Sequence, residues 1–354
     1  MIFVKQIHET TKVSFGDIFH FLQTPSFRSG LNFQKLPNHY YKKVNLLKAL
    51  LPYIIMTDID LHQFEFGTGQ LFVLNICLAF LMFAVALDIK ISDFKKVLEQ
   101  PKAVLVGLSS QLILLPLLSI ALVYAFKPAS SIALGMMLIA ACPGGNVSNY
   151  AVHLSKGNTA LSILMTSITT VSAIILTPLS FSIWTKFIPV DSAISIRVSP
   201  DQMIQTIFLL IFIPLALGML SNHYLPKFTQ KINRFVKAFA MIIFVSFAVV
   251  AIYLKFEDLR NFVHWVFLIV LVHNALALLM GYCFARLNNL PEYSARAISI
   301  ETGIQNTGLA LILIFNFFDG LGGMAIIAAW WGIWHLISGF LLASYWGKKR
   351  YSPN

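Results

Sequence analysis

Two short polar stretches decide the fold: Cys-Pro-Gly-Gly-Asn-Val-Ser-Asn at 142–149 and Glu-Thr-Gly-Ile-Gln-Asn-Thr-Gly at 301–308. Each stretch lies inside an apolar segment that is long enough to be a membrane helix. In the first, Pro143 removes a backbone donor, and the two glycines after it permit non-helical angles. A break at membrane depth survives only where protein or a cavity satisfies the freed backbone groups. The stretches therefore predict two functional breaks rather than two simple kinks.

The composition places both stretches in a membrane protein. Of 354 residues, 57% are hydrophobic and only 12% are charged, and the mean hydropathy is +0.75. Soluble domains carry about 25% charged residues, so this chain lacks the polar surface of a soluble enzyme. Its long apolar runs favour helices over a barrel, whose strands would alternate in polarity. We expect an all-α, polytopic helical membrane protein.

Nine apolar segments are long enough to span a bilayer. They lie near 69–89, 102–126, 130–153, 158–184, 202–224, 233–254, 262–286, 294–318 and 321–346. Fourteen basic residues fall on one side of this topology and five on the other. The positive-inside rule then predicts a multi-pass protein of the plasma or inner membrane, with its N-terminus outside and its C-terminus in the cytoplasm. Orientation thus explains the net charge of +11, and no nucleic-acid partner is expected.

The first 66 residues are expected to form an N-terminal extension ahead of a membrane domain at 67–350. Seven Lys and Arg residues within 1–55 conflict with an outer N-terminus. The next stretch, residues 56–69, is acidic and has no Lys or Arg. Met56 is therefore a candidate for the real start. The alternative is a disordered or surface-lying extension.

The two motif-bearing segments are related by a weak internal symmetry. They are the third and the eighth predicted spans, so an odd number of crossings separates them and they enter the membrane from opposite sides. This arrangement is typical of an inverted repeat with a pair of interrupted helices.

Glu301 is the only carboxylate far from the ends of any predicted span. An ionised acid at membrane depth costs about 2.5–3.5 kcal/mol even on lenient scales, so it needs a cation, a proton or a buried partner. The groups near it in the two motifs offer oxygens, namely Gln305, Asn306, Thr307, Ser148 and Asn149. A carboxylate among neutral oxygens suits a hard cation. The alternative is a permanently protonated Glu301 that makes one hydrogen bond.

Four further polar residues inside predicted spans are candidate site residues. Ser162 and Thr166 are four apart and share a helical face, although most such hydroxyls bond to their own backbone. The amide of Gln111 must find partners in mid-span. His335 is either a packed, neutral histidine or a donor that faces a cavity.

These motifs make the chain similar to the bile acid:sodium symporter family over about residues 67–350. The matching stretches are Phe-Ala-Val-Ala-Leu-Asp-Ile-Lys-Ile-Ser-Asp-Phe at 83–94, the two motifs at 142–149 and 300–310, and Trp-His-Leu-Ile-Ser-Gly at 334–339. The resemblance implies a core domain with two crossing discontinuous helices. It also implies a panel domain that faces the core across a substrate cavity, and two bound sodium ions.

The resemblance also implies site residues by matched position. One sodium site would use Ser148, Asn149, Ser162, Thr166 and Glu301. A second would use Gln111, Glu301 and Gln305, with the backbone oxygens of Thr302 and Ile304. The substrate cavity would be lined by Asn146, Asn306 and His335. The family often has Thr at the position of Asn146 and Asn at that of Leu336, and these departures leave the identity of the substrate open.

The expected function is sodium-coupled symport of an organic anion, either bile-acid-like or a smaller carboxylate, by alternating access. The expected partners are that anion and the lipid bilayer, and no protein partner is inferred. A proton-coupled transporter or sodium/proton exchanger of related architecture is the main alternative, and a non-transporting sensor is another. An enzyme using Ser148 and His335 is not expected, because no second carboxylate or metal-spaced histidine pair supports catalysis.

Overall fold

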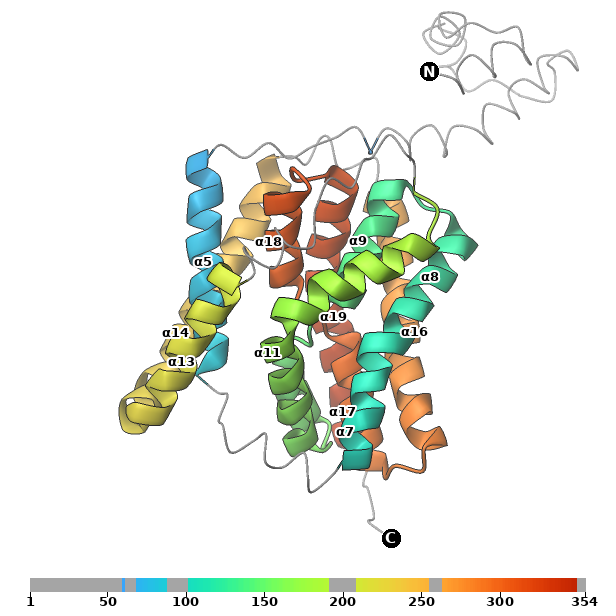
Figure 1. Cartoon of the computed structure of the whole chain (residues 1–354). Coiled ribbons are helices and arrows are strands. Elements are labelled where there is room, and N and C mark those ends of the chain that lie inside the picture. Colours follow the sequence, from blue (N-terminus) through green and yellow to red (C-terminus); the bar gives the residue numbers. More distant parts are fainter. Residues whose placement is uncertain (1–58, 61–67, 88–100, 191–207, 255–262, 349–354) are drawn as a thin grey trace, which may run out of the picture. The chain divides into compact units, whose positions relative to one another are not determined.

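The computed structural model describes residues 59–60, 68–87, 101–190, 208–254 and 263–348 (Figure 1). Within these ranges every regular element is helical, apart from one isolated β-bridge. The predicted all-α class is therefore confirmed. Met56 and most of the expected extension lie outside the described residues, as do several of the basic connections.

The first half of the bundle contains the first interrupted helix. Its elements are α5 Thr68–Ala86, α7 Pro101–Ser109, a π-helical turn Ser110–Leu114, α8 Leu115–Phe126, α9 Ser130–Ala141, α10 Val147–Leu154 and α11 Thr159–Trp184. The predicted span 130–153 is thus two half-helices, α9 and α10. Helix α9 ends before the Pro-Gly-Gly stretch and α10 begins after it, as the backbone chemistry of those residues requires.

The second half contains the second interrupted helix. Its elements are a π-helical turn Phe208–Phe212, α13 Ile213–Tyr224, α14 Pro226–Leu254, α16 Val263–Leu287, α17 Glu292–Gly303, α18 Thr307–Phe317 and α19 Gly322–Lys348. The predicted span 294–318 is likewise two half-helices, α17 and α18. Helix α14 begins at Pro226 rather than near residue 233, because its first turns are polar and a hydropathy window does not detect them.

Four described helical segments are long and apolar enough to cross a membrane. They are Pro101–Phe126, Thr159–Phe187, Val266–Leu287 and Gly322–Lys348. Shorter apolar helices are Leu71–Ala86, Ser130–Ala141, Phe208–Tyr224 and Thr307–Phe317. Two of the shorter ones, α9 and α18, are the half-helices next to the breaks, so each covers only part of a membrane's thickness.

The helices form two sets of neighbours. Helices α5, α13 and α14 contact one another and lie together in Figure 1. Helix α16 packs along α17, and α19 contacts α9, α10, α16 and α18. Asn75 of α5 and Asn316 of α18 join the two sets by exchanging amide hydrogen bonds of 3.1 and 2.9 Å.

The half-helices α9 and α18 form the centre of the second set. Every residue of α9 after Ser130 is buried, and so are residues 307–315 of α18. A helix that is apolar on all sides is stable only when other elements cover all of it. The apolar all-round sequences of α9 and α18 therefore explain why longer helices surround them and why the two breaks lie deep in the protein.

The start of α9 is stabilised by Asp60. The Asp60 carboxylate accepts hydrogen bonds from the backbone N–H groups of Ser130 and Ser131, at 3.1 and 2.8 Å. A negative charge at this position satisfies free amides and interacts favourably with the helix dipole. Ile59 beside it is buried in the main apolar cluster. Residues 59 and 60 are therefore packed on the helix bundle.

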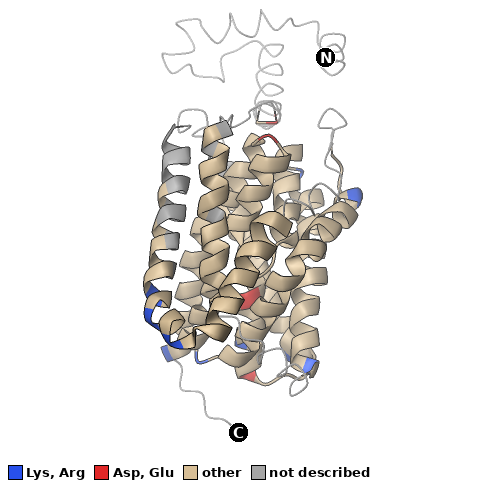
Figure 2. Ribbon diagram, turned by 60° about the vertical axis from the view of Figure 1, so that its left-hand side comes forward, with Lys and Arg blue, Asp and Glu red and all other residues tan. Residues whose placement is uncertain are grey.

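The ribbon in Figure 2 shows Lys and Arg mostly towards the helix ends, and an acidic residue also lies inside the bundle. Arg296 differs from the expectation that basic residues occupy the connections. It lies within α17, its residue is only 4% exposed, and its Nε is 3.1 Å from Glu292 Oε1. Glu292 is one helical turn earlier, so the two charges pair inside the protein.

Candidate ion-binding site

The breaks of the two interrupted helices meet through their backbones. Gly144 and Gln305 form the isolated antiparallel bridge. On either side of it, the Gly145 N–H donates to the Ile304 carbonyl at 2.9 Å and the Asn306 N–H donates to the Pro143 carbonyl at 2.8 Å. Each break thus satisfies backbone groups that the other leaves free, which is the condition for non-helical backbone at membrane depth.

Two polar side chains approach Gly144 closely at this junction. A Cβ atom at Gly144 would lie 2.7 Å from Gln111 Nε2 and 2.7 Å from Glu301 Oε2. Real Cβ atoms do not approach other heavy atoms that closely, so any other residue would push the amide and the carboxylate away. The absence of a side chain at Gly144 therefore allows the Gln111 amide and the Glu301 carboxylate to lie directly against the junction.

Glu301 lies in the last turn of α17 and is completely buried. The hydroxyl groups of Ser148 on α10 and Ser162 on α11 both donate to its Oε1 atom. Thr166 Oγ1, one turn further along α11, is 3.0 Å from each carboxylate oxygen. Three hydroxyl groups from two helices therefore surround one carboxylate that has no basic side chain among these partners.

Asn149 completes the first predicted set of ligands. Its Oδ1 atom accepts from Ser162 Oγ at 2.7 Å and from Thr166 Oγ1 at 3.3 Å. Each hydroxyl has one hydrogen, so Ser162 and Thr166 cannot donate to Asn149 and to Glu301 at the same time. The cluster has more close oxygen–oxygen contacts than hydrogens to bridge them. A cation among these oxygens would relieve that surplus.

The second predicted set of ligands lies around the backbone oxygens at the end of α17. Gln111 lies in the π-helical turn, a distortion often found at functional sites, and its Nε2 donates to the Glu301 backbone oxygen at 2.9 Å. Gln305 Nε2 donates to the Thr302 carbonyl at 2.9 Å. The Oε1 atoms of both glutamines are buried without a hydrogen-bond partner. Buried acceptors without a partner are costly, and a cation would give each of them one.

The backbone oxygens expected as ligands already have one partner each. The Thr302 carbonyl accepts from Gln305, and the Ile304 carbonyl accepts from Gly145. A carbonyl oxygen has two lone pairs, so each can still coordinate an ion. The structure thus brings the residues of the second set together around the end of α17.

Asn274 on α16 is a buried residue of this region that the sequence analysis missed. Its Nδ2 atom donates to the Gly303 carbonyl at 2.8 Å, and its Oδ1 atom accepts from Ser338 of α19. It therefore satisfies a carbonyl freed by the break and connects it to two other helices. A lone Asn in the middle of the apolar span 262–286 was the available signal.

The three residues expected in the substrate cavity have different surroundings. Asn306 Oδ1 accepts from the Leu309 N–H at 3.0 Å and caps α18. Asn146, at the equivalent position before α10, makes no side-chain cap, and its Nδ2 is 3.5 Å from the Val85 carbonyl of α5. His335 is buried, and its Nδ1 atom has no hydrogen-bond partner.

Comparison with known proteins identifies related sodium-dependent transporters. Residues 75–262 match the sodium bile acid symporter family. A Bacillus subtilis (strain 168) protein named as an uncharacterized sodium-dependent transporter, YocS, is 31% identical over 277 residues, which are 78% of this chain and 83% of that protein.

Two plant proteins are also similar. The probable sodium/metabolite cotransporter BASS2, chloroplastic, of Oryza sativa subsp. japonica is 29% identical over 90% of this chain and 74% of its own. The probable sodium/metabolite cotransporter BASS6, chloroplastic, of Arabidopsis thaliana is 31% identical over 87% of this chain and 76% of its own.

Interrupted apolar helices around a buried carboxylate, together with these matches, define an integral membrane transporter rather than an enzyme. The chain belongs to the sodium bile acid symporter family. It is accordingly a transmembrane, sodium-dependent symporter that carries a small molecule.

Proposed function

We propose that this symporter binds two sodium ions at the junction of the broken helices and carries one small organic anion with them. The observation that carries the proposal is the position of Glu301. Its carboxylate contacts hydroxyl groups that have too few hydrogens to bridge all of the close oxygen pairs. Its backbone oxygen accepts from the side-chain amide of Gln111, and the Oε1 atom of that amide has no hydrogen-bond partner. One buried carboxylate between two sets of neutral oxygens suits two hard cations.

The relatives support sodium as the coupling ion. One is named a sodium-dependent transporter and two are named probable sodium/metabolite cotransporters. The first ion would use Ser148, Asn149, Ser162, Thr166 and Glu301. The second would use Gln111, Glu301 and Gln305, with the carbonyls of Thr302 and Ile304.

The charge of the filled site favours an anionic substrate. Two sodium ions and one carboxylate leave a net charge of one, which is costly in a low dielectric unless an anion lies nearby. Helix α10 adds partial positive charge, because no side chain caps its N-terminus at Asn146. Transport of two sodium ions with one monovalent anion would move one net charge, worth about 2.3 kcal/mol per 100 mV. Substrate would then bind mainly after sodium, near Asn146, Asn306 and His335.

Alternating access would come from movement between the two sets of helices. We assign α5, α13 and α14 to the panel and the remaining described helices to the core. The amide exchange between Asn75 and Asn316 joins the two sets, so it would open and close as they rock. We further propose that the N-terminus lies outside, that the C-terminus is cytoplasmic, and that residues 1–66 precede the transporter domain 67–350.

A proton at Glu301 explains the geometry less well than sodium does. A proton would satisfy one carboxylate oxygen. It would leave the Oε1 atoms of Gln111 and Gln305 without partners, whereas a second cation would satisfy both. The proton-coupled alternative therefore accounts for only one side of the site.

The test uses purified protein with organic carboxylates that range in size from acetate to a bile acid. We expect a substrate to raise the melting temperature in sodium chloride and to have little effect in choline chloride. In proteoliposomes, uptake of that substrate should need a sodium gradient and should increase with an inside-negative potential. Uptake driven by a proton gradient in sodium-free medium would favour the alternative.

A further inference from the structure

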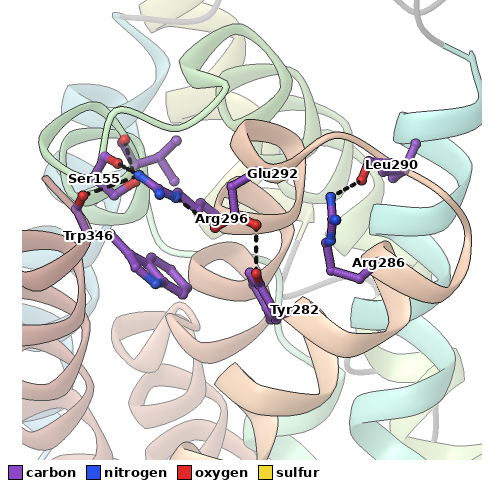
Figure 3. Close-up of polar contacts among 8 residues, drawn as sticks. Ser155, Tyr282, Arg286, Leu290, Glu292, Arg296 and Trp346 are labelled. Atoms are coloured by element: carbon purple, nitrogen blue, oxygen red, sulfur yellow. Dashed lines mark hydrogen bonds and ion pairs between the residues drawn. The ribbon is translucent and has the colours of Figure 1, made fainter. Parts of the chain in front are cut away.

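Arg296 is a buried cation in α17, five residues before Glu301, and Figure 3 shows its partners. Its Nε donates to Glu292 Oε1 at 3.1 Å. Its Nη1 atom donates to the Ser155 carbonyl at 2.8 Å and to the Trp346 carbonyl at 3.2 Å. The guanidinium also lies over the Trp346 ring, 5.8 Å from the ring centre.

These contacts join the ends of three helices. Ser155 is the C-cap of α10, Trp346 lies in the last turn of α19, and Arg296 itself belongs to α17. A buried charge must be paired to be tolerated, and Glu292 provides the opposite charge. Tyr282 of α16 in turn donates to Glu292 Oε2 at 2.6 Å, which holds the carboxylate in place (Figure 3).

Helix α10 is therefore attached to α17 at both of its ends. At its start, Ser148 donates to Glu301, and at its end the Ser155 carbonyl accepts from Arg296. Ser148 and Ser155 are seven residues apart, which is two helical turns or about 10 Å. A two-turn helix is stiff, so the position of Ser155 determines where Ser148 lies along α17.

We propose that Arg296 is a positioning residue for the sodium site, because it holds α10 where Ser148 and Asn149 meet Glu301. The inference rests on the sodium site proposed above. Arg296 does not contact the ion. It acts through α10, and its planar fork reaches two carbonyl groups and one carboxylate at once, which a lysine ammonium cannot do in the same geometry.

The test measures the sodium concentration that gives half of the sodium-induced rise in melting temperature, at constant ionic strength with choline chloride. We expect Arg296→Gln and Arg296→Lys each to increase this concentration about tenfold, the size of effect typical of groups that orient metal ligands. A purely electrostatic role would leave Arg296→Lys like the parent. A role in stability alone would lower the melting temperature in choline and leave the half-maximal sodium concentration unchanged. Either result would overturn the inference.

A second variant disturbs α10 without changing Arg296. Gly347 of α19 packs against the Leu154 carbonyl at the end of α10, and a Cβ atom at residue 347 would overlap that oxygen. Gly347→Ala should therefore move the same end of α10 and raise the half-maximal sodium concentration in the same direction. An unchanged concentration would contradict the inference even if the Arg296 variants fail to fold.

Arg286→Gln is the matched control. Arg286 also donates to a backbone carbonyl, that of Leu290 at 2.9 Å, but this bond does not involve α10 (Figure 3). Arg286→Gln should therefore have the same half-maximal sodium concentration as the parent. Glu301→Gln measured in parallel separates the two proposals. If it keeps the parent's sodium response, the sodium site itself is wrong. If it loses that response while the Arg296 and Gly347 variants keep it, only the positioning role is wrong.

Discussion

The break after α9 and the break after α17 form one junction, but their chemistry differs. The first consists of Pro143, Gly144 and Gly145, and polar side chains lie directly against the bare backbone at Gly144. The second has a buried carboxylate at Glu301 and a buried amide at Gln305. One break therefore supplies backbone without a side chain and the other supplies a charge and an amide, although the sequence predicts that an inverted repeat relates them.

The half-helices that leave the junction differ in the same way. Asn306 caps α18 through a 3.0 Å hydrogen bond to the Leu309 N–H, and the first nine residues of α18 are buried. No side chain caps α10, and Tyr150 on it is 65% exposed. Under the proposed function, α18 would mainly anchor the junction, whereas α10 would contribute sodium ligands and partial positive charge.

The largest effect is expected from removing the charge of Glu301 at the second break. Glu301→Gln keeps the size of the side chain and one oxygen, so the protein should still fold. Two cations without a counter-charge repel each other strongly in a low dielectric, so at least one ion should be lost. We expect uptake to fall about 100-fold or more, and sodium should no longer raise the melting temperature as it does in the parent. An unchanged sodium dependence would support a permanently protonated Glu301 instead.

A second prediction tests the close approach of side chains to Gly144 at the first break. In Gly144→Ala the new methyl group would push against Gln111 and Glu301, and such overpacking typically costs about 1–3 kcal/mol. Both the melting temperature in choline chloride and the affinity for sodium should decrease. Gly69→Ala in α5 is the control, because a Cβ atom there has nothing within 4 Å. If Gly144→Ala matches this control in both measurements, the close approach of Gln111 and Glu301 to residue 144 is not needed for stability or sodium binding.

A smaller effect is expected from Ser148→Ala on α10. This change removes one neutral oxygen of the first predicted set, and a hydrogen bond to a charged group is worth about 1.5–3 kcal/mol. The sodium concentration for half-maximal uptake should rise about tenfold, the lower end of that range, while the maximal rate remains. Thr169→Val on α11 is a suitable control, since Thr169 Oγ1 bonds the backbone of its own helix at 2.9 Å. Equal effects in the two variants would argue against a ligand role for Ser148.

The smallest expected effects distinguish the two helix starts. Asn306→Ala removes the cap of α18 and should cost about 1 kcal/mol of stability, visible as a lower melting temperature in choline chloride. Asn146→Ala removes no cap, so it should leave that temperature nearly unchanged and alter the affinity for substrate more than the affinity for sodium. The reverse pattern, with Asn146 stabilising and Asn306 affecting only substrate, would overturn the assignment of roles.

The breaks could be predicted from the sequence because their cause is local. Proline and glycine stop a helix where they stand, and α10 begins at Val147, directly after Asn146. Helices with strongly apolar sequences were located by hydropathy for the same reason. The start of α14 was missed because its first turns are polar yet helical. Local composition therefore predicts where an apolar helix lies and is less informative about a polar helical end.

The partners of buried polar residues could not be predicted in the same way. Arg296 meets Ser155 and Trp346, and Asn274 meets Gly303 and Ser338, so each residue joins its own helix to two others. Such pairs depend on how helices pack, which a single sequence does not specify. The grouping of oxygens around Glu301 was suggested by chemistry and completed by family resemblance, and the structure adds which of those oxygens lack a partner.

The hydrogen bonds that hold the junction together have an evolutionary consequence. They run from the Gly145 amide to the Ile304 carbonyl and from the Asn306 amide to the Pro143 carbonyl, so no side-chain atom takes part in them. Substitutions at ligand or cavity positions therefore leave these bonds available, unless proline replaces one of the two donating residues. Selection can change which ion or solute is preferred while the junction is inherited intact, and substitutions of glycine are the main exception.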